Sequence, residues 1–247
     1  MSDPTVCETQ LAQTRFVNRE ATFFLSGLAQ DIPMIFFSSD LVFDGKHGHY
    51  TEEDEPSPLT VYARTKAEAE ALVLANLLHS VVRTSLTVGK SPSGDRGIEE
   101  QLRHRWAKGD TVKLFADEYR SPIPAEVTAR ATWELALAKR PGLYHLAGSQ
   151  RMSRLEIGRA IAERNPEWNP KIESCSLRDY DGPPRAADTS LDCGKLQQLL
   201  SFPLTGLREW LASSEASVNL VPELYARFPQ KPAQIHLTAF PKRREIY

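Results

Sequence analysis

Apolar runs and amphipathic stretches alternate along the first half of this 247-residue chain. The runs Met34–Ser39 and Ser80–Ser85 predict strands buried on both faces, as in a parallel sheet. Between them, the stretch from about Leu59 to Leu78 has helical periodicity and predicts a crossover helix. Strand, helix and strand in this order indicate a parallel α/β sheet with right-handed connections.

The first thirty residues predict one long helix. Asp3 supplies a carboxylate N-cap, and Pro4 suits the first helical position. The helix is expected to run to about Gln30, where Asp31–Pro33 ends it. Its apolar residues share one broad face, namely Val6, Leu11, Phe16, Val17, Phe23, Phe24 and Leu28.

After residue 90 the pattern is mixed. Five further helices and two short strands are predicted at residues 98–108, 125–139, 153–165, 193–200 and 204–213, and at 113–116 and 142–147. The sequence from Val218 carries four prolines and ends in KRREIY. This composition predicts a surface tail or a wrapping arm.

Composition and charge exclude several classes of function. The formal net charge of −2 gives no overall field to attract nucleic acid or an acidic membrane. No apolar stretch reaches the roughly 18 residues that a membrane span requires, and the first residues do not resemble a secretory leader. Three scattered cysteines, Cys7, Cys175 and Cys193, predict reduced thiols in a cytoplasm rather than disulfides or a metal site.

Tyr62 and Lys66 lie four residues apart on the predicted crossover helix and therefore project from one face. A cation beside a tyrosine favours the phenolate, so it lowers the pKa from about 10 toward a range useful for proton donation. By itself the spacing is near chance. The alternative is two surface residues at an ordinary helical interval.

The sequence Ser38-Ser39-Asp40 follows the first predicted strand, at the edge where open α/β sheets bind ligands. Ser39 can donate to a carbonyl oxygen that Tyr62 protonates, and Asp40 can bind a substrate hydroxyl. The alternative is a strand-ending turn or a helix cap.

The segment SSDLVFDGKHGHYTEEDEPSPLTVYARTKAEAE resembles the core of extended short-chain dehydrogenase/reductases of the dTDP-4-dehydrorhamnose reductase family. That family combines S-[ST]-D-x-V-F-D-G with an acidic, proline-rich loop and then P-x-x-x-Y-[GA]-x-[ST]-K. The resemblance covers nearly everything from Asp3 to about Trp210. It continues through Arg15–Thr22, Val81–Gly89, Tyr119–Ala129, Gly142–Glu163 and Pro184–Leu200.

The resemblance implies a catalytic triad of Ser39, Tyr62 and Lys66. Tyr62 would protonate the C4 keto oxygen of a 4-keto-deoxysugar nucleotide, and Ser39 would position that oxygen. Lys66 would lower the tyrosine pKa and hold the nicotinamide ribose. The implied activity is an NADP- or NAD-dependent oxidoreductase of nucleotide-sugar biosynthesis.

Further site residues follow from the same resemblance. Asn18 matches a cofactor-side asparagine, the alternative being a buried amide that caps a helix. Thr84 and Ser85 match positions that line the nicotinamide pocket, the alternative being simple strand termination. Arg120 and Ser121 match a loop that closes on substrate, although a lone arginine is often only a surface charge.

Two departures from the family pattern limit these expectations. Leu86 stands where the family usually has an aromatic residue, so the identity of the sugar stays open. None of the 13 glycines forms GxGxxG, the turn that places the cofactor pyrophosphate at a helix N-terminus. The resemblance therefore implies that the first strands, roughly 60–70 residues, are missing before Asp3.

The expected fold is α/β: a partial Rossmann-like, doubly wound parallel sheet missing its first strands, plus a smaller mixed α/β substrate-binding part. Residues 1–90 would be the remnant of the nucleotide-binding domain, 91–215 the substrate-binding part and 216–247 a tail. Met34–Ser39 would then be an exposed edge strand, which a homodimer or a partner chain would cover.

Three interpretations of function stay open. The chain is a nucleotide-sugar reductase, with its cofactor site completed elsewhere. Alternatively it is a non-catalytic subunit that binds sugar nucleotides or has a regulatory role. The regulatory subunit of methionine adenosyltransferase, in the same superfamily, is an example. The third interpretation is a gene fragment without independent function.

Overall fold

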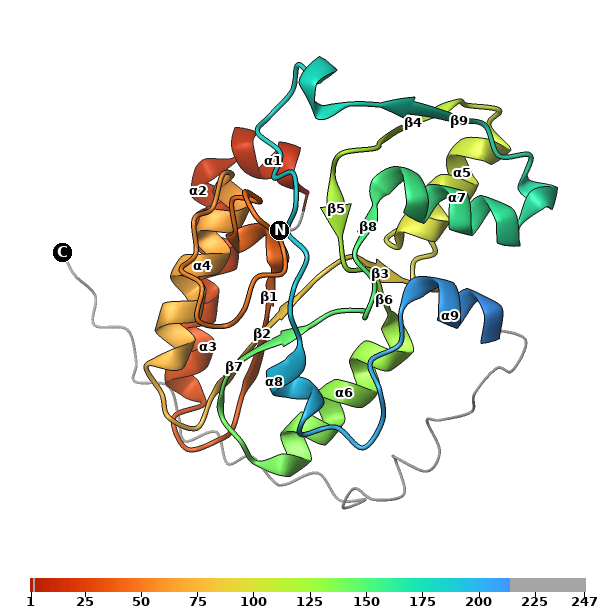
Figure 1. The fold of residues 1–247 in the computed structure, drawn as a ribbon. Coiled ribbons are helices and arrows are strands. Elements are labelled where there is room, and N and C mark those ends of the chain that lie inside the picture. The colour runs from red at the N-terminus through yellow and green to blue at the C-terminus, as the bar shows by residue number, and fades with distance from the viewer. Residues whose placement is uncertain (2, 214–247) are drawn as a thin grey trace. The chain divides into compact units, whose positions relative to one another are not determined.

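Three parallel strands form the central sheet of the computed structural model, which describes residue 1 and residues 3–213 (Figure 1). They are β1 (Ile35–Ser39), β2 (Ser80–Thr84) and β7 (Gly142–Leu146), in the spatial order β1-β2-β7. Ser39 of β1 lies opposite Thr84 of β2, so the two carboxyl ends meet at one edge. The predicted α/β fold with a parallel sheet is confirmed.

Helices cover both faces of this sheet (Figure 1). Helix α4 (Val61–Leu74) contacts β1 and β2 on one face. On the other face, α6 (Ala125–Ala138) and α8 (Gly194–Gln197) pack on a core that includes Val82 and Leu146. Because apolar side chains lie on both faces, the strands have the nearly continuous apolar sequence from which they were predicted.

A second core joins the smaller elements after residue 85. Here α5 (Ile98–Ala107), α7 (Arg154–Arg164) and α9 (Leu207–Ser213) pack beside the parallel pair β4 (Val112–Phe115) and β9 (Ile172–Cys175). The remaining short elements are β3 (Thr87–Val88), β5 (Tyr119–Arg120), β6 (Ile123–Pro124), β8 (Met152–Ser153), η2 (Asp40–Val42), η3 (Pro166–Trp168) and η4 (Leu177–Asp179). Of these, β5 and β8 pair antiparallel, while β3 and β6 pair parallel.

The prediction of one continuous helix from Asp3 to Gln30 is wrong. The segment divides into α1 (Pro4–Thr9), α2 (Leu11–Arg15), the π-helical turn η1 (Phe16–Glu20) and α3 (Ala21–Leu28). Asp3 caps α1 as expected, accepting from the Val6 amide at 3.0 Å. At the other end the Thr9 hydroxyl donates to the Val6 carbonyl at 3.0 Å, and this side-chain bond accompanies the break at Gln10.

The predicted apolar face of this segment is present, but it is exposed. Polar residues at four-residue intervals form the buried side instead, namely Thr14, Asn18, Thr22 and Ser26. Meanwhile Phe16, Phe24 and Leu28 are 62%, 59% and 70% exposed. Within the described residues, the apolar side of α2–α3 therefore lacks a covering element.

Strand β1 is the edge strand of its sheet, as predicted: across the described part of the chain it pairs with β2 alone. Phe37 is 39% exposed. The Lys66 ammonium donates to the Phe37 carbonyl and lies 4.0 Å from the centre of the Phe36 ring. The Lys66 side chain of α4 thus occupies one carbonyl of the β1 edge.

The part of the chain that the structure describes has no helix both long and apolar enough to cross a membrane. Among the same residues, no group of three or more His, Cys, Asp or Glu side chains could hold a metal ion. All three cysteines are free thiols. The division near residue 90 stays a prediction, and the predicted tail lies outside the described residues.

Candidate functional site

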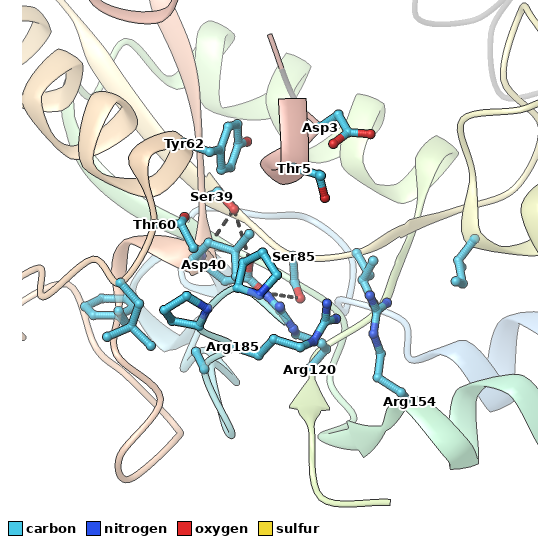
Figure 2. A pocket seen from close by; sticks show the side chains of 18 of the residues that line it. Asp3, Thr5, Ser39, Asp40, Thr60, Tyr62, Ser85, Arg120, Arg154 and Arg185 are labelled. Carbon is cyan, nitrogen blue, oxygen red and sulfur yellow. Dashed lines mark hydrogen bonds and ion pairs between the residues drawn. The ribbon is translucent and has the colours of Figure 1, made fainter. Parts of the chain in front are cut away.

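A cavity of about 500 Å³ opens at the carboxyl ends of β1 and β2 (Figure 2). Ser39, Asp40, Tyr62, Ser85 and Arg120 line it together, so the fold brings five of the predicted residues to one place. Other lining residues, not predicted as site residues, include Asp3, Thr5, Thr60, Arg96, Gln101, Arg154, Tyr180 and Arg185.

Tyr62 and Ser39 occupy one side of this cavity (Figure 2). Thr60 caps α4 through the Ala63 amide and places Tyr62 in the first turn of that helix. Burial raises the pKa of the Tyr62 hydroxyl, while hydrogen bonding with Ser39 acts to lower it. The net direction is upward, so Tyr62 keeps its proton at neutral pH.

Lys66 does not contact the Tyr62 hydroxyl. Its ammonium turns toward the β1 edge, where it donates to Phe37, and burial lowers its pKa to about 8. The expected lowering of the Tyr62 pKa by Lys66 is therefore absent from this arrangement, because the cost of burying a phenolate dominates. An ammonium has three donors, so two others stay available for a ligand.

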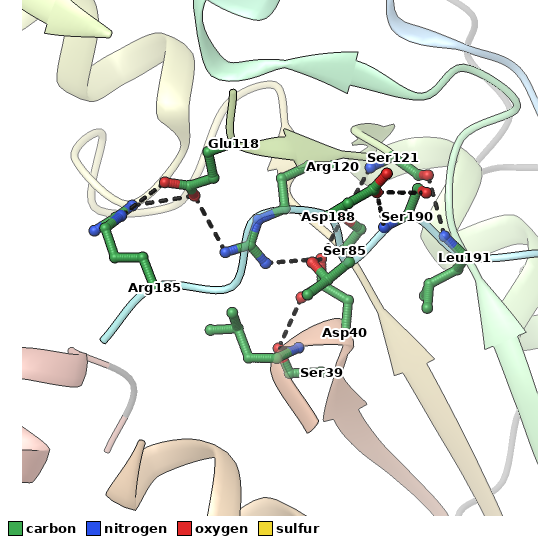
Figure 3. Close-up of polar contacts among 12 residues, drawn as sticks. Ser39, Asp40, Ser85, Glu118, Arg120, Ser121, Arg185, Asp188, Ser190 and Leu191 are labelled. Carbon is green, nitrogen blue, oxygen red and sulfur yellow. Dashed lines mark hydrogen bonds and ion pairs between the residues drawn. The ribbon is translucent and has the colours of Figure 1, made fainter. Parts of the chain in front are cut away.

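Asp40 is the hub of a buried polar network (Figure 3). Its Oδ2 accepts from the Ser85 hydroxyl at 2.7 Å, from Arg120 Nη1 at 3.0 Å and from the Thr189 hydroxyl at 3.2 Å. Among the described residues, its Oδ1 accepts only from the Ser39 hydroxyl, at 3.1 Å. Oδ1 keeps acceptor capacity, whereas Ser39 must rotate its single proton away from Asp40 to donate to a substrate carbonyl.

Three arginines meet the fully buried carboxylate of Glu118 at the opposite side of the cavity. Arg120 comes from β5, Arg154 is the first residue of α7, and Arg185 follows two prolines. Burial alone would raise the pKa of Glu118, but these guanidiniums lower it overall. Arg120 is 6% exposed, so it is not the surface charge considered as its alternative.

Sequence reasoning missed Glu118, Arg154 and Arg185. Both arginines lie in stretches that carry the family resemblance: one starts the helix after Ser153, and the other follows Pro183-Pro184. The local pattern predicts a helix start and a turn there. It does not predict that the two side chains converge.

The other predicted residues, Asn18, Lys66, Thr84 and Ser121, are not among those that line the cavity. Asn18 is buried in the π-helical turn and donates to the Thr65 hydroxyl at 3.3 Å, which ties η1 to α4. The Ser121 hydroxyl accepts from the Leu191 amide at 3.3 Å and so fixes a loop. Thr84, beside Ser39 in the sheet, has a buried hydroxyl without a hydrogen-bond partner among the described residues.

With this geometry in place, comparison with known proteins identifies the family. The sequence model of the RmlD substrate binding domain matches residues 2–219. The chain belongs to the RmlD substrate binding domain family. Its similarity to the family therefore extends well beyond the residues that line the cavity.

Relatives in this family carry several names. The chain is 32% identical over 225 residues to the probable low-salt glycan biosynthesis reductase Agl14 of Haloferax volcanii, covering 88% of this chain and 75% of that protein. It is 30% identical over 208 residues to a dTDP-4-dehydrorhamnose reductase of Sinorhizobium fredii, covering 78% of this chain and 69% of that protein. It is 29% identical over 206 residues to methionine adenosyltransferase 2 subunit beta of Rattus norvegicus, covering 79% of this chain but only 61% of that protein.

Solved structures agree on the fold. A hypothetical dTDP-4-dehydrorhamnose reductase from Sulfolobus tokodaii superposes with a TM-score of 0.73 at 29% identity, covering 84% of this chain and 73% of that one. The Bacillus anthracis reductase solved in complex with NADP gives a TM-score of 0.77 at 18% identity, covering 86% and 76%.

The residues present fit one end of a nicotinamide cofactor. Thr84 ends β2 with a buried hydroxyl that has no hydrogen-bond partner among the described residues, and Lys66, one turn after Tyr62 on α4, keeps two donors beside Phe37 of β1. A buried hydroxyl without a partner is costly, and a ligand would satisfy it. Residues 3–213 do not offer a matching site for the cofactor pyrophosphate, because they contain no glycine-rich turn that could hold it.

Proposed function

We propose that this chain carries the carbonyl-reducing and substrate-binding portion of an NADP- or NAD-dependent reductase of 4-keto-deoxysugar nucleotides. One observation carries the proposal. A single cavity holds a proton donor beside a serine hydroxyl on one side and a cluster of arginines on the other. A keto sugar joined to a nucleoside diphosphate needs both.

On the reducing side, the C4 carbonyl carbon gains a hydride and its oxygen gains a proton. Bound NADPH or NADH supplies the hydride. Tyr62, which is protonated at neutral pH, donates its proton to the oxygen. The Ser39 hydroxyl holds that oxygen after turning from Asp40, whose Oδ1 is left to accept from a sugar hydroxyl.

On the cationic side, Arg154 and Arg185 face the diphosphate. A planar guanidinium offers paired donors that match phosphate oxygens. Arg120 is committed to Asp40 and Glu118, so its charge contributes to the field while its donors mainly hold the cavity wall. Leu86 also lines the cavity and would pack against the sugar in place of an aromatic ring.

The open β1 edge and the exposed apolar side of α2–α3 support a partner on that surface, either a second copy or another chain that also supplies the cofactor phosphate site. Leu25 and Leu28 are 58% and 70% exposed, and contiguous apolar surface of this kind marks interaction sites. The free thiols support a reducing compartment such as the cytoplasm.

The test is titration of the purified chain with NADPH and NADH, followed by nicotinamide fluorescence. Saturable binding that strengthens in the presence of a sugar nucleotide is the expected result for a reductase. No binding of either cofactor at millimolar concentration would remove the reductase proposal for this chain.

The similarity to methionine adenosyltransferase 2 subunit beta supports a second candidate, a non-catalytic subunit that binds sugar nucleotides or regulates another protein. This candidate keeps the arginine side of the cavity and gives Tyr62 no chemical role. Binding of a sugar nucleotide without binding of either nicotinamide cofactor would favour it.

A further inference from the structure

Glu118 is a charged residue with no exposed surface, and nothing in the proposed reduction uses it directly. We infer that Glu118 is a positioning residue, which aims the guanidiniums of Arg154 and Arg185 at the diphosphate of the substrate. The inference rests on the nucleotide-sugar function proposed above.

Contacts of Glu118 with arginines from three parts of the chain support this role. Figure 3 shows those with Arg120 and Arg185. Its Oε1 accepts from Arg120 Nη2 at 3.3 Å and lies 3.2 Å from Arg154 Nε. Arg185 binds it with two donors, Nε at 2.7 Å and Nη2 at 3.1 Å. The Arg154 amide also donates to the Glu118 carbonyl at 2.8 Å, so side chain and backbone both fix the start of α7.

Positive charge exceeds negative charge in this cluster. Glu118 and Asp40 together carry two negative charges against three guanidiniums. Arg154 keeps a buried Nη1 without a hydrogen-bond partner among the described residues. An anion that reaches this atom would satisfy a donor that folding has already removed from water. The buried arginine cluster is therefore a better binding site for the diphosphate than an arginine on the open surface would be.

Glu118 also secures a segment that closes one side of the cavity. Residues 180–186 contribute Tyr180, Pro183, Pro184, Arg185 and Ala186 to its lining. Arg185 lies 5.5 Å from the Tyr180 ring and 5.1 Å from the Phe115 ring. The Tyr180 side chain also hydrogen-bonds with it, but neither aromatic residue carries an opposite charge. The carboxylate of Glu118 is therefore the charged group that sets the direction of Arg185.

The opposite possibility is that Glu118 competes with the diphosphate for the same arginines. The two roles predict opposite effects of Glu118→Gln, which removes the charge and keeps the size. A positioning carboxylate predicts weaker binding of a nucleoside diphosphate, because the guanidiniums lose their orientation. A competing carboxylate predicts tighter binding.

The experiment compares wild type and Glu118→Gln by titration calorimetry with dTDP and UDP, and by ligand-observed NMR with thymidine and uridine. We expect the variant to bind the better diphosphate about tenfold more weakly or worse, with the corresponding nucleoside unaffected. Equal or tighter diphosphate binding would overturn the inference, as would an equal loss for the nucleoside. A wild type that binds neither diphosphate would instead refute the proposed function.

Glu134→Gln is the matched control, because Glu134 also pairs with an arginine, but its partner Arg130 does not line the cavity. If Glu118→Gln fails to fold by circular dichroism, Arg185→Lys and Arg185→Gln carry the test. Lysine keeps the charge but cannot make two parallel bonds to Glu118. We expect Arg185→Lys to lose most of the affinity that Arg185→Gln loses, and wild-type affinity in Arg185→Lys would overturn the inference.

Discussion

Because of His145, the fold is expected to lose stability when the pH falls into the mildly acidic range. It lies fully buried in β7, with Nδ1 3.0 Å from the Tyr50 carbonyl oxygen and 3.2 Å from the Asp192 carbonyl oxygen. Its Nε2 lies 3.4 Å from Nη1 of Arg83, which pairs with the buried Glu70. Nδ1 therefore carries the proton of the neutral ring, and Nε2 accepts from the guanidinium.

A second proton on Nε2 would meet that guanidinium in a buried place. Burial first, and then the Arg83 charge, lower the pKa of His145 from 6.5 to about 4. The unfolded chain thus binds more protons than the folded chain between these values. The stabilisation is complete above pH 6.5 and is lost as the pH falls toward 4. Linkage gives a loss of about 2 kcal/mol by pH 5 and about 3 kcal/mol in full.

The assay is urea unfolding of wild type, His145→Gln and His104→Gln at pH 7.5 and pH 5. Glutamine can both donate and accept at this site but does not titrate, whereas His104 is exposed on α5. Wild type and His104→Gln should lose about 2 kcal/mol more free energy of unfolding on acidification than His145→Gln. An equal loss in all three proteins would refute the buried-imidazole argument.

Three further outcomes are expected. Tyr62→Phe should lower keto-sugar reduction by at least about 100-fold while leaving sugar-nucleotide affinity unchanged, and unchanged turnover would exclude Tyr62 as the acid. Gly148→Ala should cost about 1–3 kcal/mol in urea unfolding, because an added Cβ would lie 1.9 Å from the Pro122 carbonyl oxygen. The control Gly27→Ala, with open space around its Cβ, should instead stabilise by about 0.5–1 kcal/mol; equal effects would refute the steric argument. Light scattering should show association of the chain that Phe24→Lys weakens, and a monomeric wild type would contradict the proposed partner surface.

Strong local patterns predicted the central sheet. Apolar runs placed β1 and β2 within a residue of their observed ends, since strands covered on both faces need such runs. Strand β9 (Ile172–Cys175) was missed because its central residues are exposed and polar and its pairing partner β4 lies sixty residues away. Pairing at that distance leaves little trace in local sequence.

The first helical segment shows a different limit. Periodicity found the apolar side of α2–α3 correctly, yet it cannot say whether anything covers that side. Helix α3 packs against α4, and its buried residues are small and polar, Thr22 and Ser26. The candidate site shows the same limit. Motif spacing predicted Ser39 and Tyr62, but it did not predict Arg185, which reaches Glu118 across 67 positions of sequence.

The network around Asp40 joins residues 45, 80 and 149 positions away in the chain, namely Ser85, Arg120 and Thr189. A cavity floor assembled from such distant segments exists only when nearly the whole described chain is folded. Any ligand of the cavity should therefore protect the entire fold against heat, not one lobe of it. At a hundredfold excess over its dissociation constant, a ligand adds about 2.7 kcal/mol, which raises the melting temperature of a chain this size by about 5–10 °C. A panel of sugar nucleotides screened by melting temperature would thus rank candidate substrates without any need for turnover.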